Sequence, residues 1–271
     1  MKKNKLSLTV LTLGFAFLYL PIVLLIGYSF NESRLVTVWS GFSTKWYGEL
    51  LADTQMMDAV WLSLKIAIAA SSCAVVLGTM AAFALVRYGR FRGHTLFGSM
   101  INAPLVMPDV ITGLSLLLLF VSLQQVIGWP SERGVTTILL AHITFCTAYS
   151  TIVISSRLKE MDISLEEAAM DLGARPFKVF CQVTLPIIAP SLAAGWLLAF
   201  TLSMDDLVIS SFVSGPGSTT LPMVVFSSVR LGLSPKINAL ATLIVLVVTV
   251  AVLVAWWFSR RAERIRAETA E

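Results

Sequence analysis

Three aspartates lie inside long apolar stretches of this sequence, where a charged side chain is costly: Asp109, Asp205 and Asp206. An aspartate at the centre of a membrane-spanning helix costs about 2.5–3.5 kcal/mol on insertion scales. Lys65 is the only lysine or arginine in the same stretches. One interpretation is structural, in which the acids pair with Lys65 or cap a broken helix. The other is an acidic lining for a cationic solute, which the excess of acids favours.

The spacing of neighbouring polar residues separates the two adjacent aspartates. On a continuous helix, Asp205 and Asp206 point about 100° apart. Asp206 shares a face with Ser203 and Ser210, whereas Asp205 shares its face mainly with apolar residues. A polar stripe suits water and a passing ammonium group. We therefore predict that Asp206, Ser203 and Ser210 line a solute path with Asp109 as a second acidic point, and that Asp205 beside them is more structural.

Other reactive side chains form no recognisable site. Cys73, Cys146 and Cys181 are odd in number and include no Cys-x-x-Cys pair, so neither a disulfide framework nor a zinc site is indicated. The two histidines, His94 and His142, are far apart in the sequence, and we expect neither to bind a metal or transfer a proton. The phosphate-binding pattern Gly-x4-Gly-Lys-Ser/Thr is absent, so we expect no ATPase activity, and no enzyme activity, in this chain.

The segment 157–186 is too elaborate to be a simple connection between two helices. Ser164 and Glu167 have the spacing of a capping box, which predicts a short helix over 165–172. Gly173 then stands where a left-handed residue ends a helix. Pro176 is suited to the first turn of a second short helix. The pattern predicts two short helices joined by a sharp glycine turn.

The first of these short helices has the composition of a docking element. Glu166, Glu167 and Asp171 lie on it beside the small residues Ala168 and Ala169. Small side chains keep the helix slender enough to enter a groove on another protein, and the acids can pair with basic residues at the rim of that groove.

The composition requires lipid as the solvent for most of the chain. Of 271 residues, 56% are hydrophobic and only 13% are charged, against about 25% charged in soluble domains. A bilayer core needs roughly 20 apolar residues in a helix. Six stretches meet this length and predict an all-α membrane protein with six transmembrane helices: Leu6–Phe30, Val60–Val86, Leu96–Ile127, Val135–Ser156, Ile187–Val213 and Ile237–Phe258.

Lysine and arginine are distributed unevenly between alternate loops. Most lie in one set of tails and loops, which the positive-inside rule assigns to the cytoplasm together with both termini: Lys2, Lys3, Lys5, Arg87, Arg90, Arg92, Arg157, Lys159, Arg175, Lys178, Arg260, Arg261, Arg264 and Arg266. The formal net charge of +4 therefore reflects topology and gives no reason to expect nucleic acid. We divide the chain into a first helix and outer loop at 1–59, a transmembrane domain at 60–258 and a cytoplasmic tail at 259–271.

The second stretch carries a small residue at every fourth position. Ala70, Ala74, Gly78 and Ala82 fall on one helical face. Small residues let another helix approach closely in a membrane, so we expect this face to be packed against a neighbour.

The segment 157–186 resembles a motif of ABC-importer permeases. Glu167-Ala168-Ala169, three residues, Gly173, nine residues and then Val183-Thr-Leu-Pro186 match the pattern EAA-x3-G-x9-I-x-L-P, with Val in place of Ile. The resemblance implies the type-I ABC importer permease fold in the inner membrane, with this loop as the coupling helix that docks on a separate ATPase. It implies that Glu166, Glu167, Ala168, Ala169, Asp171 and Gly173 mediate the coupling.

Longer stretches resemble the permeases of polyamine importers, above all the second permease of putrescine importers. The similar segments are Met107–Ile111, Ser203–Gly217 and Pro235–Thr242, with Ser29–Asn31 and Trp46-Tyr47 near the start. The resemblance implies as partners a homologous permease, a dimer of ATPase subunits that hold ATP and magnesium, and a periplasmic polyamine-binding protein. It implies no cofactor in this chain itself.

Three alternatives remain open at this point. The same kind of transporter can carry another cation, such as spermidine, a basic amino acid or ferric iron. A membrane sensor or channel without a motor belongs to a different class, against which the coupling loop argues. An integral membrane enzyme needs more than the pair Asp205 and Asp206.

Overall fold

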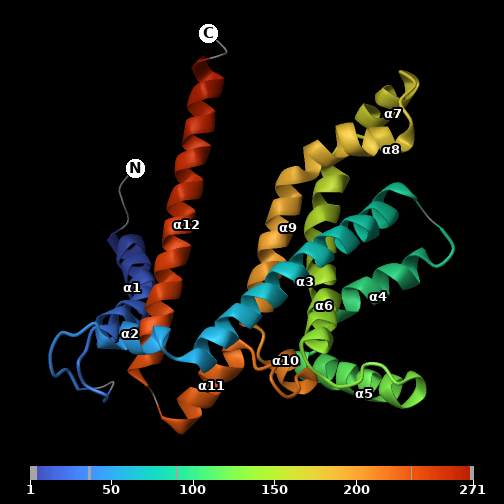
Figure 1. Cartoon of the computed structure of the whole chain (residues 1–271). Helices are drawn as coiled ribbons and strands as arrows, with labels where there is room; N and C mark the ends of the chain where they lie inside the picture. The colour runs from blue at the N-terminus through green and yellow to red at the C-terminus, as the bar shows by residue number, and fades with distance from the viewer. Residues whose placement is uncertain (1–4, 36–37, 90, 233, 269–271) are drawn as a thin grey trace. The chain divides into compact units, whose positions relative to one another are not determined.

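A computed structural model describes residues 5–35, 38–89, 91–232 and 234–268 (Figure 1). Lys2, Lys3 and Arg90, which entered the topology prediction, lie outside the described residues. In the part described, regular structure is helical, apart from one isolated bridge between Asn31 and Phe42. The chain divides into two compact units, Met1–Met57 with Val225–Glu271, and Asp58–Val224. The boundaries at 59/60 and 258/259 remain predictions.

Several helices are long and apolar enough to cross a membrane. The described residues include five of them: Ser7–Ser29, Thr54–Arg87, Asp109–Ile127, Val135–Glu160 and Pro176–Asp205. Shorter apolar helices cover Leu221–Arg230 and Pro235–Val250. The first predicted stretch corresponds to α1 (Lys5–Ser29), and the last falls within α12 (Pro235–Glu268).

The first unit is built on helices from both ends of the chain. In it α12 packs against α1 and against the short helix α2 (Lys45–Leu51). Lys236 at the start of α12 lies 3.2 Å from the Asp53 carboxylate. The backbone N–H of Met56 and the Lys236 ammonium together hold the pKa of Asp53 below its usual value. The indole of Trp46 donates to the carbonyl of Asn31, at 2.6 Å, and so fastens the loop that follows α1.

The second unit is framed by α3 (Thr54–Arg87), α6 (Val135–Glu160) and α9 (Leu185–Asp205), with α6 and α9 in extensive contact (Figure 1). The predicted small-residue face of α3 is confirmed, because Ala70, Ala74, Gly78 and Ala82 are all buried. A Cβ added at Gly78 would lie 3.0 Å from the Ser150 Cβ of α6. Small residues therefore set the close approach of these two helices.

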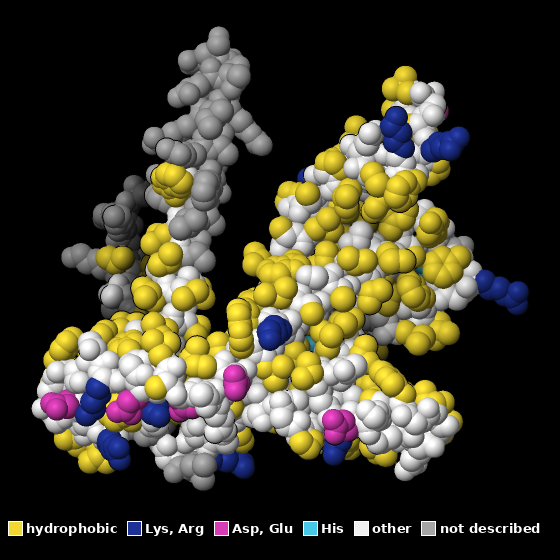
Figure 2. Space-filling model, in the orientation of Figure 1, with side chains coloured by type: hydrophobic (Ala, Val, Ile, Leu, Met, Phe, Trp, Pro, Cys, Tyr) yellow, Lys and Arg dark blue, Asp and Glu magenta, His cyan; other side chains and the backbone are white. Residues whose placement is uncertain are grey.

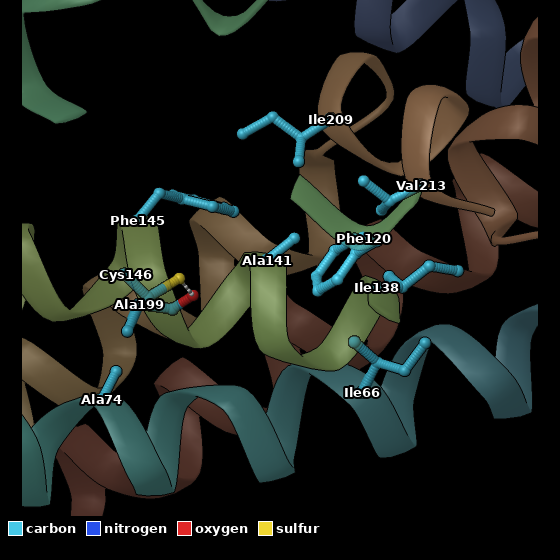
Figure 3. Close-up of a cluster of buried hydrophobic side chains, with 10 residues drawn as sticks. All are labelled: Ile66, Ala74, Phe120, Ile138, Ala141, Phe145, Cys146, Ala199, Ile209 and Val213. Carbon is cyan, nitrogen blue, oxygen red and sulfur yellow. Dashed lines mark hydrogen bonds between the residues drawn. The ribbon is translucent and has the colours of Figure 1, made fainter. Parts of the chain in front are cut away.

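The apolar core of this unit joins segments from its whole length. Figure 3 shows ten buried side chains that meet between the helices: Ile66, Ala74, Phe120, Ile138, Ala141, Phe145, Cys146, Ala199, Ile209 and Val213. The Cys146 thiol donates to the Ala199 carbonyl across the α6–α9 contact. This cluster therefore packs α3, α6 and α9 together with two further helices over Asp109–Ile127 and Val208–Val213.

Two predicted spans are broken. The stretch Leu96–Ile127 forms α4 (His94–Val106) and α5 (Asp109–Ile127), which separate at Met107 and Pro108. Proline lacks an N–H and disfavours the helical conformation in the residue before it. The stretch Ile187–Val213 likewise forms α9 and the short α10 (Val208–Val213), with Asp206 extended between them. The chain then enters α11 (Leu221–Leu231).

The exposed surface of the helices is mainly apolar. Figure 2 shows hydrophobic side chains spread widely over the visible helical surface, with few charged side chains among them. Large residues of α3 such as Val76, Leu77 and Met80 are 45–66% exposed. A surface of this kind is stable in lipid and not in water.

Candidate functional site

The loop after α6 forms the two short helices that its sequence predicts. They are α7 (Ser164–Asp171) and α8 (Pro176–Val179), and a π-helical turn over Phe180–Thr184 connects α8 to α9. Gly173 has a φ of +86° between them, which confirms the left-handed turn. Pro176 opens α8 as expected. The loop is thus continuous with α9 and stands at its end (Figure 1).

The predicted capping box is wrong. Ser164 is the first residue of α7 and its side chain makes no capping hydrogen bond. Instead, the Asp162 carboxylate accepts the backbone N–H of Ser164, at 3.0 Å. This hydrogen bond lowers the pKa of Asp162. The group that accepts the first backbone N–H of α7 is therefore the Asp162 carboxylate, two residues before Ser164, and not the Ser164 hydroxyl that we expected to cap the helix.

Glu166 has a different environment from the other acids of α7. Its carboxylate lies 3.1 Å from Nε of Arg87 and accepts a hydrogen bond from Thr184 at 2.7 Å, with only 10% of the side chain exposed. The expectation that Glu166 pairs with basic residues of another protein is therefore corrected, because both carboxylate oxygens already have partners inside this chain.

The remaining predicted docking residues face outward. Glu167, Ala168 and Asp171 are exposed, and Ala169 is half-buried. The same loop exposes large apolar side chains that the sequence analysis did not single out, with Leu172 at 90% and Phe177 at 78%. The described residues of the second unit leave both side chains largely uncovered. The outward face of α7 and α8 thus combines acids, small residues and apolar anchors.

The three intramembrane aspartates of the sequence analysis come together. Asp109, Asp205 and Asp206 line one cavity of about 210 Å³ in the second unit. Asp109 begins α5 directly after the break at Pro108, where the helix N-terminus favours an acid. Phe145 and Tyr149 of α6 line the same cavity. The site therefore combines acidic groups with an aromatic wall.

Asp206 is held by a buried polar cluster, which we name the His142 cluster: His142, Ser203, Asp206 and Ser210. The His142 ring lies 2.6 Å from the Ser203 hydroxyl, 3.2 Å from the Asp206 carboxylate and 3.0 Å from the Ser210 hydroxyl. The carboxylate also accepts the backbone N–H groups of Ile209 and Ser210, at 3.1 and 2.7 Å. These are donors that the first turn of α10 leaves unpaired, so the Asp206 carboxylate caps the helix from the residue before its N-cap, Leu207.

The structure corrects the assignment of the two adjacent aspartates. Ser203, Asp206 and Ser210 do meet, but across a break between helices and around His142, and not along one continuous face. Four contacts engage the Asp206 carboxylate, from the His142 ring, the backbone N–H groups of Ile209 and Ser210, and the Ser210 hydroxyl, and 9% of the side chain is exposed. Asp205 is exposed, and among the described residues its carboxylate has no hydrogen-bond partner. The structural aspartate is thus Asp206, and Asp205 is the available one.

His142 is the residue that sequence reasoning missed. We expected it neither to bind a metal nor to transfer a proton and predicted no structural role, yet it is 1% exposed and contacts groups of α9, α10 and the segment between them. The sequence did contain a sign of this role. His142 is an imidazole inside the apolar stretch Val135–Ser156, whose other ionisable groups are only Cys146 and Tyr149. Lys65, which the structural interpretation offered as a partner of the acids, lies over the Trp61 ring at 5.8 Å.

Comparison with known proteins identifies the family. Residues 74–266 match the family described as "Binding-protein-dependent transport system inner membrane component". The chain belongs to this family. It is 65% identical over 259 residues, 96% of its length and 92% of the relative's, to the putrescine transport system permease protein PotI of Escherichia coli K12. It is 41% identical over 250 residues, 92% of each chain, to the spermidine/putrescine transport system permease protein PotC of the same strain.

Solved structures show the same fold at low sequence identity. A chain of a bacterial ABC transporter involved in the import of the acidic polysaccharide alginate superposes with a TM-score of 0.72 and 17% identity, covering 95% of both chains. A chain of the MetNI methionine ABC transporter gives 0.59 and 16% identity, covering 74% of this chain and 92% of that one. The fold of this inner membrane component is therefore that of type-I ABC importer permeases.

The role of the chain follows from its membership in this family. It is a permease subunit of an ABC importer in the inner membrane, and ATP hydrolysis belongs to a separate subunit. Because one structural neighbour serves an acidic polysaccharide, the shared fold leaves the solute open. The cavity and the similar sequences are the features of this permease that bear on the identity of the solute.

Proposed function

We propose that this permease carries a polyamine, with putrescine as the first candidate, from the periplasm to the cytoplasm. The observation that carries the proposal is the cavity that gathers Asp109, Asp205 and Asp206. The 65% identity to a putrescine permease over nearly the whole chain supports it.

The chemistry of the cavity fits a small, flexible dication. Exposed carboxylates at Asp109 and Asp205 attract ammonium groups, and Asp206 adds negative charge that the described lysines and arginines do not pair. The faces of Phe145 and Tyr149 accept methylene groups, and an aromatic face also attracts a cation. A diamine has both features, since an apolar chain separates its two charges.

The outward face of α7 and α8 is the proposed contact with the ATPase. Glu167 and Asp171 supply charge, Ala168 and Ala169 keep the helix slender, and Gly173 makes the turn. Leu172 and Phe177 add apolar anchors of the kind that fill a groove. Movement of the ATPase would reach the membrane helices through this loop.

The assembly proposed around the chain follows the same logic. The partners are a homologous permease, two ATPase subunits that hold ATP and magnesium, and a periplasmic polyamine-binding protein. Both termini and α7 lie on the cytoplasmic side, as the distribution of lysine and arginine favours. No cofactor is assigned to this chain.

Reconstitution of the whole complex tests the function. The complex with its binding protein is placed in liposomes, and ATP hydrolysis and uptake are measured with putrescine, spermidine, lysine and arginine. We expect putrescine to stimulate hydrolysis and to accumulate inside. Stimulation by a basic amino acid alone would move the proposal to another cation.

A matched control separates an importer from a channel. The same complex is prepared with an ATPase subunit that binds ATP and does not hydrolyse it. We expect no accumulation of putrescine in these liposomes. Uptake that continues without hydrolysis would replace the importer by a passive path.

A further inference from the structure

A buried ion pair connects the end of α3 to the loop that follows α6. Arg87 is the last residue of α3, and its Nε lies 3.1 Å from the Glu166 carboxylate in the first turn of α7. Both side chains are only 10% exposed. The Arg87 guanidinium also reaches the Met161 carbonyl, at 3.5 Å, directly after α6.

The other oxygen of Glu166 binds the segment that leads into α9. Thr184, which is 1% exposed, donates its hydroxyl hydrogen to this oxygen at 2.7 Å. Thr184 ends the π-helical turn, and α9 begins at the next residue. Arg87, Glu166 and Thr184, which we name the Glu166 latch, therefore join α7 to α3 and to the start of α9.

The surroundings of the latch make the pairing obligatory. Met161, whose carbonyl the Arg87 guanidinium reaches, belongs to a buried apolar cluster that joins α3, the end of α6 and α9: Ala82, Ile154, Leu158, Met161 and Ile188. An ionised carboxylate in such a place is stable only when it is paired and hydrogen-bonded. The opposite face of α7, with Glu167 and Asp171, is exposed. One short helix thus has an outward face for docking and one inward carboxylate bound to two other elements.

We propose that the Glu166 latch transmits movement of α7 to α3 and α9, with Arg87, Glu166 and Thr184 as positioning residues. The inference rests on the proposed coupling role of α7 and adds the path inside this chain. If α7 is displaced as a rigid piece, the latch forces the end of α3 and the start of α9 to follow. Without the latch, α7 follows the ATPase while the membrane helices lag behind.

The test measures how much solute is transported for each ATP hydrolysed in the reconstituted complex. Glu166→Gln keeps the shape of the side chain and an acceptor for Thr184 but removes the charge that pairs with Arg87. We expect the complex to assemble and hydrolyse ATP, while transport per ATP falls about tenfold, within the range typical of coupling between sites. Glu160→Gln is the matched control, because it removes an exposed ion pair with Arg157 in the same region. It should leave the ratio unchanged.

A double-variant cycle distinguishes a latch from two independent supports. If Arg87 and Glu166 act as a unit, Arg87→Met combined with Glu166→Gln should lower the ratio no further than either single variant. The proposal would be overturned if the double variant lowered transport per ATP by the product of the two single effects. It would also be overturned if the single variants had a normal transport per ATP. If the Glu166→Gln complex does not assemble, Thr184→Val provides the test, because it keeps the side-chain volume and the ion pair between Arg87 and Glu166. We expect Thr184→Val to lower transport per ATP. A normal value for this variant would overturn the latch.

Gly173→Val, measured in parallel, separates this proposal from the one on which it rests. If Gly173→Val uncouples transport and the latch variants do not, the path inside the chain is wrong and the docking role stands. If Gly173→Val transports normally as well, the coupling role of the loop is itself wrong.

Discussion

At the scale of single residues, hydrogen-bond partners distinguish two carboxylates that are adjacent in the sequence. Asp206 caps α10 and contacts His142, whereas Asp205 is exposed at the cavity without a partner among the described residues. A carboxylate whose lone pairs are occupied contributes to the stability of the fold and to the local field. A carboxylate without partners can bind a cation directly.

This difference predicts opposite phenotypes for two identical substitutions. Asp205→Asn should raise the KM for the transported polyamine about tenfold, the equivalent of about 1.4 kcal/mol, with the complex present in normal amount. Asp206→Asn should instead lower the free energy of unfolding by about 1–3 kcal/mol, since buried donors lose a charged acceptor. Uptake kinetics and thermal melting of the solubilised complex measure both. A raised KM for Asp206→Asn with normal kinetics for Asp205→Asn would reverse the assignment.

His142 should be a stabilising residue whose loss affects Asp206. His142→Phe keeps a ring of similar size against Phe145, whose centroid is 5.3 Å away, but leaves Ser203, Asp206 and Ser210 without the imidazole. We expect a loss of about 1–3 kcal/mol in stability, seen as a lower melting temperature. His94→Phe, at the start of α4, is the control and should melt nearly as the parent does. Equal melting of both variants would argue against the His142 cluster.

At the scale of elements, two glycines have different structural roles. Gly173 forms the turn between α7 and α8, and Gly113 allows α5 and α10 to approach each other closely. Gly173→Val should strain the turn between α7 and α8 by about 1–2 kcal/mol, because φ is +86° there. No atom lies within 4 Å of the added Cβ, so the effect comes from the backbone and not from a clash. We expect weaker co-purification of the ATPase and reduced transport. Gly89→Val is a useful comparison, with positive φ but outside the loop 157–186.

Gly113 controls a different contact, between α5 and α10. A Cβ at this position would lie 2.7 Å from a ring carbon of Phe212 and 3.3 Å from the Cα of Ile209. Gly113→Val should therefore push α10 away from α5 and disturb the cavity that Ile209 and Asp109 line. We expect lower thermal stability together with lost uptake. Gly98→Val, whose added Cβ meets its nearest atom at 3.6 Å, should be tolerated better.

At the scale of the whole molecule, the proposed contact between α7 and the ATPase requires that α7 lie on the cytoplasmic side of the membrane. Single cysteines at Arg92 and Arg157 should be protected from an impermeant thiol reagent added to the outside of cells, and those at Trp129 and Gly217 should be labelled. The background lacks Cys73, Cys146 and Cys181, with alanine at the buried Cys146. Labelling at position 92 from outside would contradict the proposed topology, provided that uptake by the variant is normal.

Composition and local pattern were sufficient for the class of protein and for its most regular parts. Apolar runs of membrane-spanning length predicted the helices, since their hydrogen bonds are local and lipid requires them. The small-residue face of α3 and the turn at Gly173 also followed from spacing, because helical periodicity and backbone sterics act within a few residues. The motif in the segment 157–186 indicated the family in a different way, through its resemblance to the pattern of ABC-importer permeases.

Only the tertiary structure decided which acids are engaged and which are available. The face argument for Asp206 assumed one continuous helix, and the break after Asp205 removed that assumption. Glu166 seemed equivalent to Glu167 in the sequence, but Arg87 and Thr184 approach it from distant parts of the chain. His142 acquired its partners in the same way. A buried polar group is defined by the partners that satisfy it, and those partners come from segments that only folding brings together.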